Sequence, residues 1–143
     1  MFNSLFKKFS GQDQDNNKPK QVATAVMLLY IGFILSMVTD WLDGIGIIPF
    51  LVVFIVISAV ITAISAGRKW ARILILLFVI FNLVSFGFNI AQLLSHGIKE
   101  KFTNLVMALY GIEVIIELIA LRLLFSKPAN SWFNEQWEMT SEN

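Results

Sequence analysis

Cysteine is absent from this chain of 143 residues, and histidine occurs only once, as His96. The chain therefore has no means to form a disulfide, a thiolate nucleophile, or a cysteine-ligated or histidine-rich metal site. The sequence also contains no Ser/His/Asp arrangement and no glycine-rich loop of the kind that cradles phosphates. These absences predict a protein that is not an enzyme, with no catalytic residue, no metal site and no cofactor.

Charged residues are scarce as well, at 15% of the chain, whereas soluble domains carry about 25%. The net charge is only +1, so nothing in the charge balance indicates nucleic-acid binding. In place of charge, hydrophobic residues make up 57% of the chain and are gathered into four long runs. This distribution is typical of an integral membrane protein.

Each apolar run is long enough to cross a bilayer, which takes about 20 residues of helix. Three runs contain no charged residue, and the fourth, from Phe102 to Leu121, contains only Glu113 and Glu117. Short links place consecutive helices side by side and antiparallel. We therefore expect an all-α, up-and-down four-helix transmembrane bundle (residues 21–125) between an N-terminal segment (1–20) and a C-terminal tail (126–143). The expected spans are residues 21–39, 45–66, 73–96 and 102–125.

Lysine and arginine are distributed unevenly around these spans. Nine of them lie before the first span, in the second link, and from the end of the fourth span onward. Only Lys99 and Lys101 lie in the third link, and the first link has none. Because cytoplasmic segments carry the excess of positive charge, we expect both termini in the cytoplasm.

The first ten residues hold a second pattern, in which apolar side chains recur at helical spacing beside Lys7 and Lys8. The apolar members are Phe2, Leu5, Phe6 and Phe9. This pattern favours a short amphipathic helix on the anionic inner surface of the membrane. The alternative is a disordered basic tail.

Polar side chains follow one face of the third span at steps of three and four residues. They are Asn82, Ser85, Asn89, Gln92 and His96. Polar groups that face lipid are costly, so this stripe is expected to face the interior of the bundle. The second span instead carries a cluster of small residues, which predicts close helix packing. That cluster comprises Ser58, Ala59, Thr62, Ala63, Ser65, Ala66 and Gly67.

Glu113 and Glu117 lie one turn apart on the fourth span, within the apolar region. Burial and mutual repulsion both disfavour ionised carboxylates, so at least one of the two is expected to be protonated at neutral pH. Hydrogen-bond partners at suitable depths lie on other spans. The candidate intramembrane polar site is Glu113, Glu117, Asn82, Ser85, Asn89 and Tyr30.

The link between the second and third spans is basic, with Arg68, Lys69 and Arg72. These three side chains are candidate contacts for lipid phosphates. The alternative is that they only hold the link on the cytoplasmic side of the membrane.

Two short motifs carry a resemblance to a known group of proteins. One is GRKWARI at residues 67–73, and the other is SKPANSWF at residues 126–133. Together they resemble small bacterial four-span inner-membrane proteins that are largely uncharacterised. The resemblance covers the layout from Val22 to Phe133 and implies a multi-pass protein of the bacterial cytoplasmic membrane. It implies no activity, cofactor or site residue.

The acid pair supports two interpretations. Protonated glutamates can hydrogen-bond across the bundle and brace it, or they can bind a proton, a cation or a cationic substrate. We accordingly expect a non-enzymatic membrane protein that acts through contacts within the bilayer, of an accessory, regulatory or immunity type. The alternative is a small proton- or cation-coupled transporter or channel that uses Glu113 and Glu117. Expected partners are the lipid bilayer and either another membrane protein or a second copy of the chain.

Overall fold

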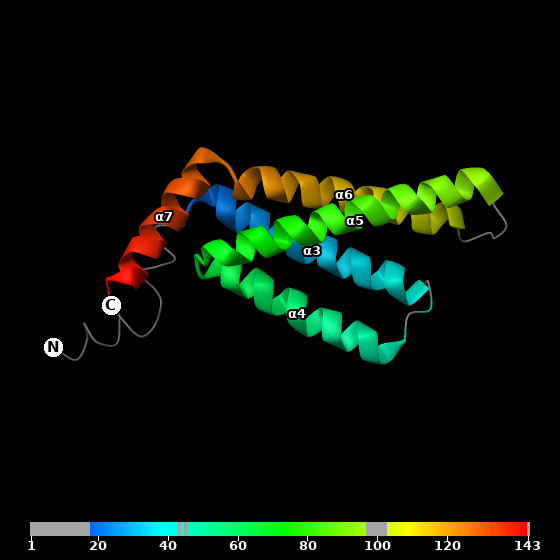
Figure 1. Cartoon of the computed structure of the whole chain (residues 1–143), viewed down its shortest axis with the longest axis horizontal. Coiled ribbons are helices and arrows are strands. Elements are labelled where there is room, and N and C mark those ends of the chain that lie inside the picture. The colour runs from blue at the N-terminus through cyan, green and yellow to red at the C-terminus, as the bar shows by residue number, and fades with distance from the viewer. Residues whose placement is uncertain (1–17, 43, 45, 97–102, 143) are drawn as a thin grey trace.

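The computed structural model describes residues 18–42, 44, 46–96 and 103–142, and almost all of these residues are helical (Figure 1). Four helices are long enough and apolar enough to cross a membrane. They are α3 (Lys20–Leu42), α4 (Ile47–Ser65), α5 (Lys69–His96) and α6 (Thr103–Leu124), and α7 (Lys127–Ser141) follows them. The predicted all-α helical bundle is confirmed. The predicted amphipathic helix within residues 1–10 lies outside the described residues.

The four long helices form a ring in which each contacts two neighbours. The most extensive contact joins α3 to α6, the first and last of the four, and α5 contacts α4 and α6. Neighbours in the ring run antiparallel, as an up-and-down bundle requires (Figure 1). Gly32 lies at the contact between α3 and α6, where a Cβ would touch Ile116 and Glu117 at ordinary contact distance.

The small residues supply only part of the packing of α4: Ala63 lies against the core, but most of the buried surface comes from larger side chains. Its buried side chains are branched aliphatic ones at helical spacing, Ile57, Val60, Ile61 and Ile64, while Ala59 and Thr62 are exposed. Thr62 can face outward because its hydroxyl donates to the carbonyl of Ser58 in the same helix, at 2.7 Å. The larger aliphatic side chains then supply the packing area that holds α4 to its neighbours.

Helices α4 and α5 diverge from the turn that joins them (Figure 1). Every buried residue of α4 lies within 57–64, and those of α5 lie within 71–79. The remaining parts, residues 47–56 and 80–95, contain no buried side chain. The bundle is therefore packed at the end that holds the α4–α5 turn and open at the opposite end. We call these two ends the basic end and the far end.

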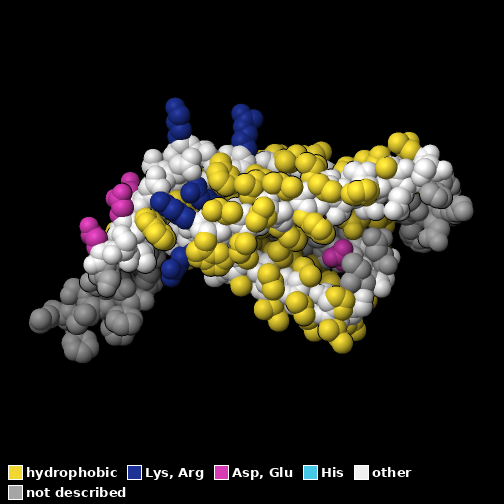
Figure 2. All heavy atoms as spheres, in the orientation of Figure 1, with side chains coloured by type: hydrophobic (Ala, Val, Ile, Leu, Met, Phe, Trp, Pro, Cys, Tyr) yellow, Lys and Arg dark blue, Asp and Glu magenta, His cyan; other side chains and the backbone are white. Residues whose placement is uncertain are grey.

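The C-terminal tail forms helix α7, which the sequence patterns had not predicted. It begins after Ser126 with Pro128 in its first turn, where a missing N–H costs little. Its buried side chains are Ala129, Trp132, Phe133 and Gln136, at the spacing of one helical face. Helix α7 contacts α3, α5 and α6 and covers the basic end, where Lys and Arg side chains gather in Figure 2.

Candidate functional site

The two glutamates of α6 are enclosed by helices on several sides. Glu113 is 2% exposed and Glu117 is 5% exposed. The hydroxyl of Ser36 on α3 donates to the carboxyl of Glu113. The amide Nδ2 of Asn82 on α5 donates to Oε1 of Glu117 at 3.0 Å. Three helices therefore hold the pair in a fixed position.

Each carboxyl group of the pair keeps one oxygen without a partner. The Oε2 atoms of Glu113 and Glu117 are both buried and accept no hydrogen bond. The neighbouring charges that act on the pair are acidic, with Asp40 near Glu113 and Glu113 near Glu117. Buried carboxylates without a compensating cation are costly. The arrangement is thus suited to holding a proton, which could bridge or cap these oxygens, or a small cation.

The predicted partners of the pair divide into two groups. Asn82 is confirmed by its hydrogen bond to Glu117, and Ser85 is half-buried on the same face of α5. Asn89 is exposed, although α6 reaches this half of α5, where Phe86 lies near Gly111. Tyr30 is 39% exposed, and its place in the site stays a prediction. It follows buried Leu29 directly, so it lies about 100° around the helix from it.

Ser36 is the partner that sequence reasoning missed. Most of the candidate partners lay on the third span, whereas the main contact of α6 is with α3. The signal in the sequence was the pair Gly32 and Ser36, four residues apart on one face of the first span. Gly32 lies against Glu117, with its Cβ position 3.8 Å from Cγ of the glutamate, and Ser36 bonds Glu113 one turn further along.

Arg72 does not point toward lipid phosphates, so its assignment as a lipid contact was wrong. It is 9% exposed, and its Nη1 donates to the carbonyl of Leu124 at 3.2 Å and to Oδ1 of Asn130 at 2.7 Å. Its guanidinium lies 4.1 Å from the ring centre of Phe133 and 5.2 Å from that of Phe125. Helix α5 begins at Lys69, before the predicted boundary, so Arg72 falls one turn inside the helix and faces α7.

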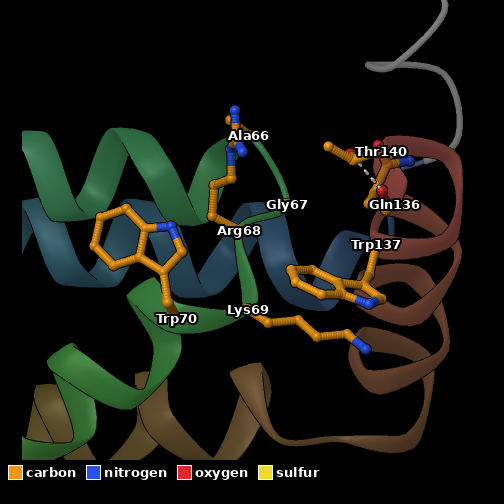
Figure 3. A pocket seen from close by; sticks show the side chains of 8 residues that line it. All are labelled: Ala66, Gly67, Arg68, Lys69, Trp70, Gln136, Trp137 and Thr140. Atoms are coloured by element: carbon orange, nitrogen blue, oxygen red, sulfur yellow. Dashed lines mark hydrogen bonds between the residues drawn. The ribbon is translucent and has the colours of Figure 1, made fainter. Parts of the chain in front are cut away.

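Arg68 and Lys69 instead border a cavity of about 190 Å³ between the α4–α5 turn and α7 (Figure 3). Its lining residues are Ala66, Gly67, Arg68, Lys69, Trp70, Gln136, Trp137 and Thr140. The ammonium of Lys69 lies 5.5 Å from the ring centre of Trp137. Arg68 and Lys69, two of the three predicted phosphate contacts, are thus both among the residues that line one cavity.

Within the residues that the structure describes, no three His, Asp or Glu side chains form a group that could hold a metal ion. The chain matches no protein-family model, and neither a characterised protein nor a solved structure is significantly similar to it. The resemblance to bacterial four-span proteins therefore stays a prediction. Three features of the molecule bear on its function: the acid pair, the open half of the bundle and the cavity at the basic end.

Proposed function

We propose that the protein is a non-enzymatic, multi-pass component of the bacterial cytoplasmic membrane that acts by binding another membrane protein within the bilayer. Accessory, regulatory and immunity proteins work in this way. The observation that carries the proposal is the exposure of Asn89 and Gln92 in the open half of α5. Nothing in the described residues covers these amides.

Asn89 lies at a depth where lipid offers no hydrogen bonds. Helix α5 has 28 residues, about 42 Å at 1.5 Å per residue, which exceeds the about 30 Å of a hydrocarbon core. Asn82 is near the middle of the helix, and Asn89 is seven residues, or about 10 Å, further along. Polar side chains at such depth are stabilised by bonds across helix interfaces. A partner helix with a hydrogen-bonding side chain would satisfy Asn89.

The divergence of α4 and α5 favours a different protein over a second copy as this partner. A two-fold contact places the same surface of each copy against the other. In such a dimer the gap between α4 and α5 of one copy would face the same gap in the other copy, and no helix would fill either gap. A single transmembrane helix seated along residues 80–95 of α5 would cover the amides and the apolar side chains beside them.

The distribution of charge supports the proposed orientation. Lys18, Arg68 and Lys69 lie at the basic end, and Asp40 lies near the far end of α3. Because positive charge is retained in the cytoplasm, the basic end and α7 are proposed to face the cytoplasm.

A photo-crosslinking residue tests the partner surface. Placed at Asn89 or Gln92 in intact cells, it is expected to crosslink to one membrane protein of defined size. The matched control is Ala91, which is also exposed but lies about 200° around the helix from Asn89. We expect no such product from Ala91, and at least a severalfold loss of the Gln92 product when Asn89 is replaced by leucine.

Three outcomes would contradict the proposal. They are equal crosslinking from Ala91, a product that is a second copy of the chain, and products with lipid alone from both amide positions. Because the chain lacks cysteine, single cysteines at the same positions can verify the contact by disulfide formation with the identified partner.

Proton or cation coupling is the second candidate function, and the buried, unpartnered Oε2 atoms of Glu113 and Glu117 favour it. An oxygen of this kind can accept a proton or coordinate a cation, while Ser36 and Asn82 hold the other oxygens. Asp40 adds a third carboxyl group near Glu113, toward the far end of the bundle. The buried apolar side chains of Ala25, Leu29 and Ala120 separate the pair from the basic end.

Reconstituted vesicles test this second candidate. With Glu113 and Glu117 intact, we expect proton or monovalent cation flux above that of empty vesicles, and Glu113→Gln or Glu117→Gln is expected to reduce it at least tenfold. Asn89→Leu is the control, because it leaves the acid pair intact. Unchanged flux in both glutamine variants, or no flux with the native chain, would exclude coupling through the pair.

A further inference from the structure

The cavity at the basic end is formed by a tight turn and a helix from the other end of the chain (Figure 3). Gly67 adopts a φ of +79°, a left-handed conformation that glycine reaches without strain. A Cβ at this position would lie 2.8 Å from Cγ of Gln136. The turn and α7 are therefore in direct contact beside the cavity, and its shape depends on both.

The charged side chains that line this cavity are both positive. Arg68 is exposed and Lys69 is half-buried, and no acidic side chain is among the lining residues. Helix α5 begins at Lys69 with no acidic residue in its first turn. The first N–H groups of a helix have no partner within it and carry partial positive charge. The cavity thus combines two side-chain cations with a helix terminus oriented to attract an anion.

The surroundings place this cavity at the level of lipid headgroups. Trp70 and Trp137 border it and are 50% and 56% exposed, and tryptophan is enriched where apolar and aqueous regions of a membrane meet. The cavity lies at the end of two apolar helices, α4 and α5. Its volume of about 190 Å³ is below the about 300–1,000 Å³ of pockets that enclose whole small molecules. It would hold a phosphate group with part of a headgroup, while the remainder of the ligand stays outside.

We propose that this cavity binds the phosphate of an anionic phospholipid, with Arg68 and Lys69 contacting the phosphate oxygens and the acyl chains lying along the apolar surface of α4 and α5. Trp70 and Trp137 flank the headgroup. A bound lipid would contact the turn and α7 at once, so it would also hold α7 in place. This site is independent of the acid pair and of the partner surface on α5.

Lipid titration of the full chain in detergent tests the proposal, with native mass spectrometry counting bound lipids. Phosphatidylglycerol is expected to bind at least tenfold more tightly than phosphatidylcholine. The double variant Arg68→Gln/Lys69→Gln is expected to lose about thirtyfold in affinity for phosphatidylglycerol, from the loss of two cations. The matched control, Arg122→Gln/Lys127→Gln, removes two exposed cations outside the cavity and is expected to change affinity less than threefold.

Thr140→Trp supplies a second variant that keeps every charge. Thr140 is exposed and lines the cavity, and its hydroxyl donates within α7, to the carbonyl of Gln136 at 2.8 Å. A tryptophan there is expected to occupy the cavity and reduce phosphatidylglycerol binding at least tenfold with helix content unchanged. Full binding by this variant would overturn the proposal, even if the charge variant failed to fold.

Two further results distinguish a lipid site from a basic surface and from a site for a free anion. Equal losses in the cavity variant and the matched control would show attraction to the basic surface as a whole and overturn the assignment. Displacement of phosphatidylglycerol by equimolar inorganic phosphate or glycerol phosphate would identify a site for a free anion, which also overturns the lipid assignment. Retention of the lipid against a hundredfold excess of either anion supports it.

Discussion

Replacing Arg72 by leucine is expected to detach α7 from the bundle. The substitution removes a guanidinium that donates to Leu124 and Asn130 and contacts the ring of Phe133. Hydrogen bonds from a charged donor contribute about 1.5–3 kcal/mol each. Helix α7 has 15 residues, a length that is marginal for an isolated helix in water. Hydrogen exchange of residues 127–141 should show at least a hundredfold loss of protection.

Two variants serve as controls for this experiment. Arg122→Leu removes an exposed arginine from the end of α6 and should leave the protection of α7 unchanged. Arg72→Lys keeps the charge but not the planar group that lies over the aromatic ring, so an intermediate loss is expected. Native protection of α7 in Arg72→Leu would mean that Trp132 and Phe133 hold the helix without help from the arginine.

The role of Arg72 illustrates what sequence patterns omit. The basic link indicated topology or lipid binding, and the third span was expected to start after Arg72. The structure starts α5 earlier and gives the arginine an acceptor on α7, a helix that had not been predicted. The apolar spacing of α7 was present in the sequence, because Ala129, Trp132, Phe133 and Gln136 lie on one helical face. Polar residues between them obscured it.

Which helices contact each other in the bundle was harder to predict than the positions of the helices in the sequence. Length and composition predicted four spans, since a bilayer requires long apolar runs. In such runs every face is apolar, so hydrophobic periodicity does not identify the face that packs. Polar residues are the remaining signal: Asn82 was one of the candidate partners of the acid pair and bonds Glu117, whereas Ser36, the partner of Glu113, was not among the candidates. Asn89 shows that a polar stripe need not be buried within its own chain.

Replacing Gly32 by leucine is expected to separate α3 from α6 and destabilise the whole bundle. A Cβ at this position would lie 3.5 Å from Cγ2 of Ile116 and 3.8 Å from Cγ of Glu117, in ordinary contact. Gly32→Ala should therefore be tolerated. The further carbons of leucine are expected to displace Ile116 and Glu117, and overpacking of this kind costs about 1–3 kcal/mol. Unfolding by SDS in mixed micelles, followed by tryptophan fluorescence, measures the loss.

Gly87→Leu is the matched control, because it adds the same side chain to α5 where no atom lies within 4 Å of the Cβ position. It should unfold at the same SDS fraction as the native chain. A loss for Gly87→Leu as large as that for Gly32→Leu would indicate a general effect of bulk on these helices. It would contradict a specific contact at the α3–α6 interface.

A compensating substitution identifies the contact directly. Ile116→Ala removes the side chain nearest to the position that a new leucine would occupy. The double variant Gly32→Leu/Ile116→Ala should recover at least half of the stability lost by Gly32→Leu, because contacting residues show non-additive effects. Both glutamates are unchanged in this variant, so recovery would assign the loss to packing and not to the acid pair. Strictly additive losses would instead place Gly32 and Ile116 apart in the folded bundle, and the enclosure of Glu113 and Glu117 between α3 and α6 would have to be abandoned with it.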